Sequence, residues 1–561
     1  LTKDPLPKDI VTALFSPNYL KTAFNANFER TCLAKWLAAP LPPGQWSCTA
    51  VMAKELGLPN SLADVGVVLG LPEVKLDTGR SLIRYFSMPC KPTKVNGMRT
   101  RNLPKDCPEK WAQYIAYNKR DVEVERNIRK KLIKYPIAES EHKLWVLDQT
   151  INDRGVLNDT DFAAKAIKFD SQIKESITTT LKAVTGLENP NSVAQFKEWI
   201  FRETGVRPES LEKKSLPALK AQLNSEKVNR VLDLRERVSK TSTKKYTAMI
   251  NTAGRDNRIR GLTQFYGAGR TGRWAGRLVQ MQNLPQNKMP DTDLHSARTL
   301  VKSNSLESFE MLFDNTTSVL SQLIRTAFIP KPGCRFIVSD FSAIEARVIA
   351  WIASEKWRLD VFNTHGKIYE ASAEQMFHLP PGSVKKGDPM RQKGKIAELA
   401  LGYGGSVGAL KAMGALDMGL NEAELKPLVD CWRQANPNIV KLWWQVDAAM
   451  RACLRRRPPV ILPHGIQMRM EGPLMRLKLP SGRETSYVKP KIDIHDSITY
   501  EGMIQDKGGW GRIETYGPKM VENIIQAIAR DCLAEAMTRL EEIVDLFNVA
   551  VRDSVHSAIA D

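Results

Sequence analysis

Two aspartates, each in an apolar stretch, are the residues of this 561-residue sequence best suited to hold catalytic metal ions. Asp340 ends the stretch 335–340, which is typical of a buried strand, and Asp553 lies in the late apolar stretch 547–554. A buried carboxylate without a partner is costly, so an aspartate at a strand end favours a metal ligand. Two-metal phosphoryl transfer requires two such carboxylates, because one ion activates the attacking hydroxyl and the other stabilises the leaving pyrophosphate.

The cysteines and histidines argue against zinc and against disulfides. None of the eight cysteines stands in a CxxC pair, and the seven histidines form no close cluster with them. A structural zinc site is therefore not expected, and the cysteines are predicted to be free thiols in a reducing compartment. A metal held by carboxylates alone is expected to be Mg²⁺, with Mn²⁺ as the alternative.

Four residues spaced four apart, Arg391, Lys395, Leu399 and Tyr403, would share one stripe of a helix. The stripe runs from two cations through an apolar residue to an aromatic ring. It would suit a nucleoside triphosphate, with the phosphates on the cations and the base near the ring. The alternative is an ordinary basic amphipathic helix. The glycines of this segment argue against that alternative, because each costs about 1 kcal/mol in a helix.

A third carboxylate, Glu345, has two interpretations. Ser342 and Glu345 fit a capping box at the start of a helix, which would make Glu345 structural. That helix would bury one face, made of Ile344, Val348, Trp351 and Ile352. The functional interpretation depends on the family resemblance described below.

Two basic segments could contact a phosphate backbone. Lys240, Lys244 and Lys245 are interleaved with Thr and Ser hydroxyls that suit phosphate contacts; the alternative is a solvated helix end. Residues 267–285 concentrate Gly, Arg and amide side chains, which let a backbone approach a ligand and bond phosphates or base edges. The run 455–457 is expected to be a solvated face.

The elements that would position these residues follow from length, charge and periodicity. A length of 561 residues corresponds to about four domains. The 82 Lys and Arg against 62 Asp and Glu give a charge of +20, which favours nucleic acid or an acidic membrane surface as partner. No apolar run reaches the roughly 18 residues of a membrane span.

The expected elements change along the chain. Residues 1–135 resemble an α/β domain. Residues 139–250 are expected to be mostly basic helices, the first with Leu144, Leu147 and Ile151 at i, i+3 and i+7 spacing. From residue 331 strands and helices are expected to alternate.

Ordered segments along residues 267–554 resemble family-A DNA polymerases in their bacteriophage form. The segment 340–347 resembles motif A, and the stripe from Arg391 to Tyr403 resembles motif B, the fingers helix. Asp553 falls where motif C has its metal-binding Asp. The DNA-contacting segments before motif A and the palm helix before motif C are matched by Thr271–Arg273, Gln282–Pro285 and Glu522–Ala527.

This resemblance implies a role for each matching residue. Asp340 and Asp553 would bind two Mg²⁺, while Arg391 and Lys395 would hold the triphosphate and Lys395 would protonate the leaving pyrophosphate. Glu345 would exclude ribonucleotides. In the nucleotide site, Leu399 would contact the incoming sugar and Tyr403 would gate the templating base. The residues that would contact the primer–template are Arg273, Gln282, Asn283, Gln526, Arg552, Lys240, Lys244 and Lys245.

The N-terminal part resembles a 3′–5′ proofreading exonuclease. Asn25 and Glu29 match its second motif, and Tyr117 and Asp121 match the Tyr-x3-Asp third motif. The first motif, Asp-x-Glu, does not occur in residues 1–24, and Glu29 stands where the family usually has Asp. The sequence therefore predicts weak or absent exonuclease activity.

Three further departures from the family pattern affect the polymerase part. Leu399 replaces an aromatic residue, so the flat ring that packs on the incoming sugar is lost. Motif C usually has His-Asp-Glu, whereas this chain has Arg552-Asp553-Ser554, so Ser554 cannot supply the second carboxylate. The chain lacks an initiator Met and ends at Asp561, where the family continues, so it is expected to be a fragment at both ends.

The sequence thus predicts an α+β multidomain DNA polymerase: an RNase H-like exonuclease domain followed by a right-hand polymerase. The predicted boundaries are 1–135 for the exonuclease-like domain, 136–257 for the thumb, 258–365 with 446–561 for the palm, and 366–445 for the fingers. The expected partners are primer–template DNA, dNTPs and replication accessory proteins, without a membrane, in the cytoplasm of a phage-infected bacterium. The alternative is a catalytically impaired primer–template binding protein that keeps the fold.

Overall fold

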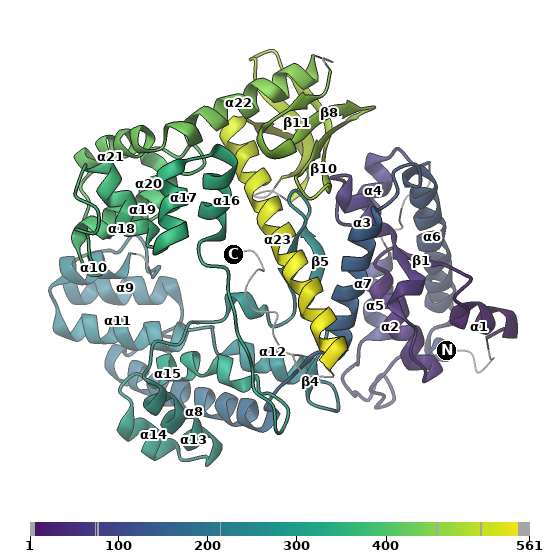
Figure 1. Cartoon of the computed structure of the whole chain (residues 1–561). Helices are drawn as coiled ribbons and strands as arrows, with labels where there is room; N and C mark the ends of the chain where they lie inside the picture. Colours follow the sequence, from purple (N-terminus) through teal and green to yellow (C-terminus); the bar gives the residue numbers. More distant parts are fainter. Residues whose placement is uncertain are drawn as a thin grey trace. The chain divides into compact units, whose positions relative to one another are not determined.

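The computed structural model describes residues 6–72, 75, 78–213, 215–455, 458–504 and 508–547 (Figure 1). Two compact units emerge from the contacts: the first contains Leu1–Thr150, Phe265–Ala275 and Asp340–Ile543, and the second contains Ile151–Gln264 and Gly276–Ser339. Both units mix helices and strands, as predicted. Within the described ranges, no helix is long and apolar enough to cross a membrane.

The N-terminal part of the first unit is mostly helical. Its two described strands pair in parallel and are three residues long. Helices α3, α4 and α6 share an apolar core that includes Leu56, Val65, Val124 and Ile128. The elements are α1 (Lys8–Phe15), β1 (Lys21–Ala23), α2 (Ala26–Leu37), β2 (Trp46–Cys48), α3 (Thr49–Glu55), α4 (Leu62–Val68), α5 (Gly79–Ser87) and α6 (Pro108–Leu132).

Helix α7 (Glu139–Arg154) begins where the sequence predicts, but its most buried face is different. Leu144, Leu147 and Ile151 are only half-buried. The buried positions of the same helix carry Trp145 and three polar residues, Glu141, Asp148 and Gln149. The helix predicted from this spacing is confirmed. Its buried polar residues could not be predicted, because hydrophobic periodicity does not detect polar side chains that are buried with partners.

Seven helices lie between residue 340 and the sheet that follows them, and all of them except α17 contribute to one apolar core shared with that sheet. A buried ion pair at their centre joins α17 to α19: Arg358 bonds to Glu398, which also accepts hydrogen bonds from Ser372 and Trp432. The helices are α16 (Ile344–Ala353), α17 (Lys356–Thr364), α18 (Ile368–Met376), α19 (Pro389–Leu401), α20 (Val407–Ala412), α21 (Glu422–Ala435) and α22 (Pro437–Leu454).

An antiparallel six-stranded sheet and one long helix complete the described part of the first unit. The strands are adjacent in chain order from β7 to β12, so helices and strands are separated here rather than alternating, and the predicted alternation was wrong. These elements are β7 (Val460–Ile461), β8 (Gln467–Glu471), β9 (Leu474–Lys478), β10 (Glu484–Ile492), β11 (Ile498–Ile504), β12 (Gly509–Thr515) and α23 (Gly517–Phe547).

The second unit is organised around one long helix, α8, and confirms the predicted run of helices. Asp159 caps α8 by accepting a hydrogen bond from the Phe162 backbone N–H, and Gly186 ends it in the left-handed conformation. The elements are β3 (Val156–Leu157), α8 (Thr160–Thr185), α9 (Val193–Thr204), α10 (Leu216–Leu223), α11 (Glu226–Ser239), α12 (Lys244–Thr252), β4 (Arg258–Ile259), α13 (Asp291–Lys302), α14 (Leu306–Leu312) and α15 (Thr316–Gln322).

The stretch 335–340, predicted to be a buried strand, belongs to none of the described sheets. Ile337 and Val338 are 56% and 67% exposed. An apolar stretch becomes a strand only when a neighbouring strand satisfies its backbone groups. Residues 335–340 form no strand and are mostly exposed, so this prediction was wrong.

Candidate active site

Helix α19 presents three of the four stripe residues on one side. Asp388 caps the helix by accepting a hydrogen bond from the Met390 backbone N–H at 2.8 Å, and Pro389 occupies the first turn. The opposite side of α19 is buried and includes Ile396, Ala397 and Leu401. Arg391, Lys395 and Leu399 lie on the side of α19 away from this core. Arg391 and Lys395 are half-buried, and Leu399 is 49% exposed. The common face of these three was predicted correctly, whereas Tyr403 lies two residues beyond the helix end.

The glycines of this segment have structural reasons that the sequence did not reveal. A Cβ at Gly394 would overlap the Tyr369 carbonyl oxygen, so glycine lets α18 and α19 pack closely. Gly404 has φ +75°, and a Cβ there would lie 2.6 Å from the Pro518 Cβ. Their presence is therefore no argument against a structural role, and the inference drawn from them was wrong.

Arg391 is held by a carboxylate that sequence reasoning missed. Its Nε donates to Glu370 Oε1 at 2.7 Å. Burial acts to raise the pKa of Glu370, but the hydrogen bond and the charge of Arg391 outweigh burial and hold this pKa below its usual value. The bond uses Nε and leaves the two terminal nitrogens of Arg391 without a hydrogen-bond partner among the described residues, while the guanidinium lies 5.5 Å from the centre of the Tyr369 ring. Glu370 lies 21 positions before Arg391 and on a different helix, α18, so no local pattern could have identified it.

Lys395 is the cation most available to a ligand on α19. Its side chain is half-buried. It makes no hydrogen bond or ion pair with any described residue, whereas neighbouring Lys393 pairs with Glu424 at 2.6 Å. A lysine without an internal partner on a face shared with Arg391 is suited to bind phosphate oxygens.

Leu399 gives the first testable prediction. Replacing it with Phe restores the flat ring typical of the family at an exposed position, so folding stability should change by no more than about 0.5 kcal/mol. We expect Leu399→Phe to lower the apparent KM for dNTP or to raise the extension rate. Leu416→Phe, at a site 41% exposed, is the matched control. Unchanged KM and rate in Leu399→Phe would refute a role for this side chain.

Glu345 forms the centre of a three-residue contact. Tyr403 donates its hydroxyl to Glu345 Oε2 at 2.8 Å, and Arg273 Nη1 lies 3.6 Å from Glu345 Oε1. Burial, and then the charge and hydrogen bond of Glu345, raise the pKa of the Tyr403 hydroxyl well above its ordinary value. Tyr403 is therefore a neutral hydrogen-bond donor that fixes the Glu345 carboxylate.

The capping box predicted for Glu345 is absent. Helix α16 begins at Ile344, and Ala343 before it has φ 50°, so Ser342 is not the capping residue. No side chain caps this helix end, and Glu345 instead bonds to Tyr403. Of the predicted buried face, Val348 and Ile352 are buried, whereas Trp351 is 39% exposed.

The hairpin of β5 (Thr263–Ala268) and β6 (Arg273–Gly276) carries Arg273, and two buried arginines hold its turn. Arg530 Nε donates to the Gly272 carbonyl at 3.1 Å, and Arg483 Nη2 donates to the Thr271 carbonyl at 3.0 Å. Both guanidinium groups are almost fully buried. These contacts fix the two residues that immediately precede Arg273.

Carboxylates neutralise this buried arginine pair. Arg530 makes two hydrogen bonds to Glu141, of 2.8 and 2.7 Å, and so joins α23 to α7, which lie side by side (Figure 1). Arg483 pairs with Asp531 at 2.6 Å. Asp148, also on α7, accepts from the Trp274 indole at 3.1 Å. The buried polar face of α7 therefore exists to hold the hairpin and α23 together.

The remaining predicted polymerase residues are in different settings. Asp340 is exposed and has no protein partner among the described residues. Gln526, half-buried on α23, donates to Glu522 at 3.4 Å. The predicted residues Arg552 and Asp553 lie outside the described residues.

Two further predicted residues belong to the second unit. Gln282 packs against Gly276, and its Oε1 is buried without a hydrogen bond to any described residue. Asn283 is exposed.

The basic segment 240–245 is less available to phosphate than expected. Thr243 is buried and donates to Asp170 at 3.0 Å, and Ser242 bonds to Ser321 at 2.7 Å. Lys245 donates to the Val279 carbonyl at 2.7 Å, and burial lowers its pKa and that of Lys240. The hydroxyls of Ser242 and Thr243 are thus internal, which corrects the expectation that they contact phosphate. Lys244 keeps an exposed ammonium group.

The exonuclease-like residues do not assemble a metal site within the described part of the chain. Asp121 pairs with Lys75 at 3.1 Å, and Lys75 also lies 5.2 Å from the centre of the Tyr117 ring.

The residues that match the second exonuclease motif have a different setting. Burial and the charge of Glu125 both raise the pKa of Glu29, and together they outweigh a backbone hydrogen bond that lowers it. Asn25, with φ 70°, precedes α2. No three metal-ligating side chains cluster among the residues the structure describes.

Comparison with known proteins identifies the class. The family model "DNA polymerase family A" matches residues 161–452, and the chain belongs to this family. It is a DNA-directed DNA polymerase and synthesises DNA on a template. The chain is 55% identical over 543 residues to the DNA polymerase of Bacillus phage SP02, a match that covers 96% of this chain and 83% of that protein.

More distant matches agree with this membership. A thermostable DNA polymerase I of Thermus caldophilus is 32% identical over 127 residues, which cover 22% of this chain and 15% of that protein. The fold is similar to the polymerase domain of Pol1 from M. smegmatis, solved in complex with DNA primer-template and dNTP. That similarity has a TM-score of 0.59 at 14% identity and covers 98% of this chain and 82% of the other.

Proposed function

We propose that this polymerase transfers a nucleotide from dNTP to a primer 3′-hydroxyl at the exposed face of α19, in the replication of a phage genome. The observation that carries the proposal is the placement of Arg391, Lys395 and Leu399 on that one face. Arg391, oriented by Glu370, and Lys395, which has no ion pair among the described residues, would bind the triphosphate. Lys395 would donate a proton to the leaving pyrophosphate, and Leu399 would contact the sugar.

Glu345, Tyr403 and Arg273 would form the part of the site nearest the primer terminus. Glu345, fixed by the Tyr403 hydroxyl, would close off the sugar 2′ position and exclude ribonucleotides. Arg273 and Gln526 would contact the primer–template, together with Gln282, Asn283, Lys244 and Arg552. Tyr403 would gate the position of the templating base. The resemblance to family-A motifs supports these assignments.

Members of this family use divalent metal ions, and Asp340 fits that use because its carboxylate is exposed and unpaired among the described residues. Asp340 and Asp553 would hold two Mg²⁺. When bound, such ions lower the pKa of an attacking hydroxyl and stabilise charge on a leaving pyrophosphate. Lys395 and Arg391 would add positive charge to the triphosphate.

We assign the parts of the right-hand polymerase by the same resemblance. The thumb would comprise residues 136–257 and the fingers 366–445. The palm would comprise residues 258–365 and 446–561, and residues 1–135 would form the exonuclease-like domain. The protein would act in the cytoplasm of an infected bacterium.

The second candidate function is a catalytically impaired primer–template binding protein. It is favoured by Ser554 in the position of the second motif C carboxylate. Measuring binding and extension on the same primer–template with wild type and Asp340→Ala separates the two functions. Extension that depends on Asp340, with binding retained in the variant, supports the proposal. Binding without extension by wild type favours the second candidate.

Exonuclease activity is predicted to be weak or absent. The half-buried Lys75 ammonium already neutralises Asp121, so a divalent cation would have to displace it. A 5′-labelled single-stranded oligonucleotide incubated with Mg²⁺ should remain largely intact. Rapid degradation that Asp121→Ala abolishes would contradict this prediction.

A further inference from the structure

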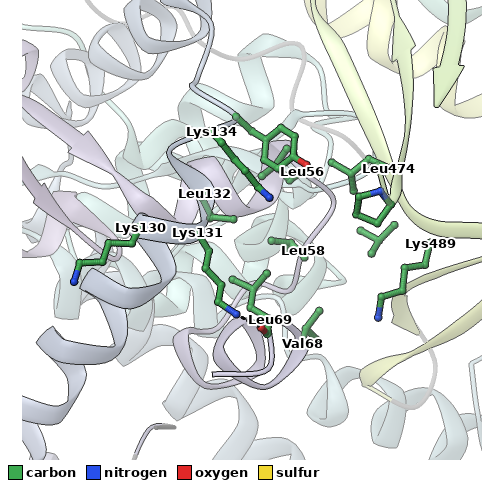
Figure 2. A pocket seen from close by; sticks show the side chains of 13 residues that line it. Leu56, Leu58, Val68, Leu69, Lys130, Lys131, Leu132, Lys134, Leu474 and Lys489 are labelled. Atoms are coloured by element: carbon green, nitrogen blue, oxygen red, sulfur yellow. Dashed lines mark hydrogen bonds between the residues drawn. The ribbon is translucent and has the colours of Figure 1, made fainter. Parts of the chain in front are cut away.

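A cavity of about 500 Å³ lies within the first unit, away from every residue assigned above (Figure 2). Helices α4 and α6, the turn after α3 and strands β9 and β10 surround it. Its volume lies in the range of pockets that bind ligands. The apolar wall is formed chiefly by Leu56, Leu58, Val68, Leu132 and Leu474.

Four lysines surround this cavity: Lys130, Lys131, Lys134 and Lys489, and none of the lining residues is acidic. Lys131 donates to the Leu69 carbonyl at 2.7 Å, and Lys489 pairs with Glu501 at 3.1 Å. In Figure 2, Leu58 lies between Lys131 on one side and Lys489 on the other. Lys130 and Lys134 are exposed, and neither pairs with a carboxylate among the described residues. Lys130 and Lys134 therefore leave positive charge at the edge of the cavity, with Lys130 directed away from the apolar lining in Figure 2.

An aliphatic wall with lysines at its edge defines the ligand chemistry. The wall is complementary to a buried apolar side chain, and the lysines are complementary to carboxylates beside it. Single-stranded nucleic acid is bound through aromatic platforms on which bases stack; Tyr135 is the one aromatic residue in this lining. A bilayer needs an exposed amphipathic face rather than a concave pocket.

We propose that this cavity, called the lysine-rimmed pocket, binds an acidic peptide segment of a partner protein that carries one or two large apolar side chains. The apolar side chains would enter between Leu58, Leu132 and Leu474. The acidic residues on either side would pair with Lys130 and Lys134. Because the pocket shares no residue with the nucleotide site, a partner could be tethered there while synthesis continues.

The test measures the fluorescence anisotropy of a labelled peptide, Asp-Glu-Asp-Leu-Phe-Asp-Glu-Asp, titrated with the full chain in about 150 mM salt, where surface attraction is screened. We expect saturable binding. Replacing the acids with their amides, or Leu and Phe with Ser, should each weaken binding about tenfold or more. An oligothymidylate decamer should not displace the peptide.

Charge-reversal variants locate the site. Lys130→Glu combined with Lys134→Glu should weaken peptide binding about tenfold or more and leave primer extension unchanged. The matched control, Lys91→Glu with Lys94→Glu, makes the same charge change at two exposed lysines outside the pocket and should bind the peptide like wild type. Val68→Asp, which alters the wall, should also weaken binding, with its melting temperature checking the fold.

Three results would overturn the proposal. Equal binding by wild type and the Lys130/Lys134 variant would place the peptide elsewhere. Equal loss in the control variant would show attraction to the overall charge of +20. Displacement of the peptide by the decamer would assign the surface to nucleic acid.

Discussion

Lys395→Met is expected to lower the rate of nucleotide incorporation by about 10²–10⁴-fold, the range typical of losing a general acid. Lys395 makes no hydrogen bond or ion pair among the described residues, so its removal should not disturb the fold. It shares the exposed face of α19 with Arg391, where both would bind the triphosphate. The measurement is single-turnover incorporation over a range of dNTP concentrations.

Two matched variants separate charge from proton donation. Lys395→Arg keeps the positive charge but donates a proton far less readily, so it should retain dNTP binding while losing most of the rate. Lys393→Met, about 200° around the helix from Lys395 and paired with Glu424, should lose little of either. A Lys395→Met enzyme with wild-type rate at saturating dNTP would refute the assigned role.

Arg530→Met is expected to lower the free energy of unfolding by about 3–5 kcal/mol, because it leaves the buried Glu141 carboxylate without its partner. The guanidinium group is almost fully buried and also stacks against Trp274, 4.8 Å from the ring centre. The same change removes the hydrogen bond to the Gly272 carbonyl. Primer–template affinity should therefore fall along with stability.

A double variant tests whether the loss comes from the unpaired charge. Glu141→Gln added to Arg530→Met removes the uncompensated carboxylate and should recover part of the stability. Primer–template binding should stay weak, since the Gly272 carbonyl still lacks its donor. Arg539→Met, an exposed change on the same helix with a surface pair to Glu535, should cost less than about 1 kcal/mol. Full stability in Arg530→Met would contradict the role of this network.

Local patterns predicted the parts of the site that depend on one element. The four-residue spacing predicted a common face for Arg391, Lys395 and Leu399, and α19 confirms it. The basic helical run before residue 250 is confirmed as well. The resemblance to family-A polymerases, carried by ordered motifs, is confirmed by the family match and the phage relative.

Contacts between distant segments could not be predicted in this way. Tyr403 bonds to Glu345 across 58 positions, and Arg530 bonds to Glu141 across 389. The capping box failed because Ala343 adopts a left-handed conformation and delays the helix start. Gly394 had a packing partner, the Tyr369 carbonyl, that no local pattern could indicate.

Strand prediction failed for a related reason. The stretch 335–340 has an apolar pattern, but a strand also needs a partner at hydrogen-bonding distance. The alternation predicted after residue 331 was wrong because sequence reasoning did not recognise that the strands gather between Val460 and Thr515. The roles of Asp340 and Asp553 therefore rest on the family motifs and remain predictions.

The most direct measurement is single-nucleotide incorporation on four hairpin primer–templates that differ in the templating base, each offered every dNTP with Mg²⁺. Wild type should add the complementary nucleotide on each template, and Asp340→Ala should bind the hairpins with similar affinity but add none at a measurable rate. Addition that ignores the templating base, or undiminished addition by Asp340→Ala, would contradict template-directed synthesis at this site.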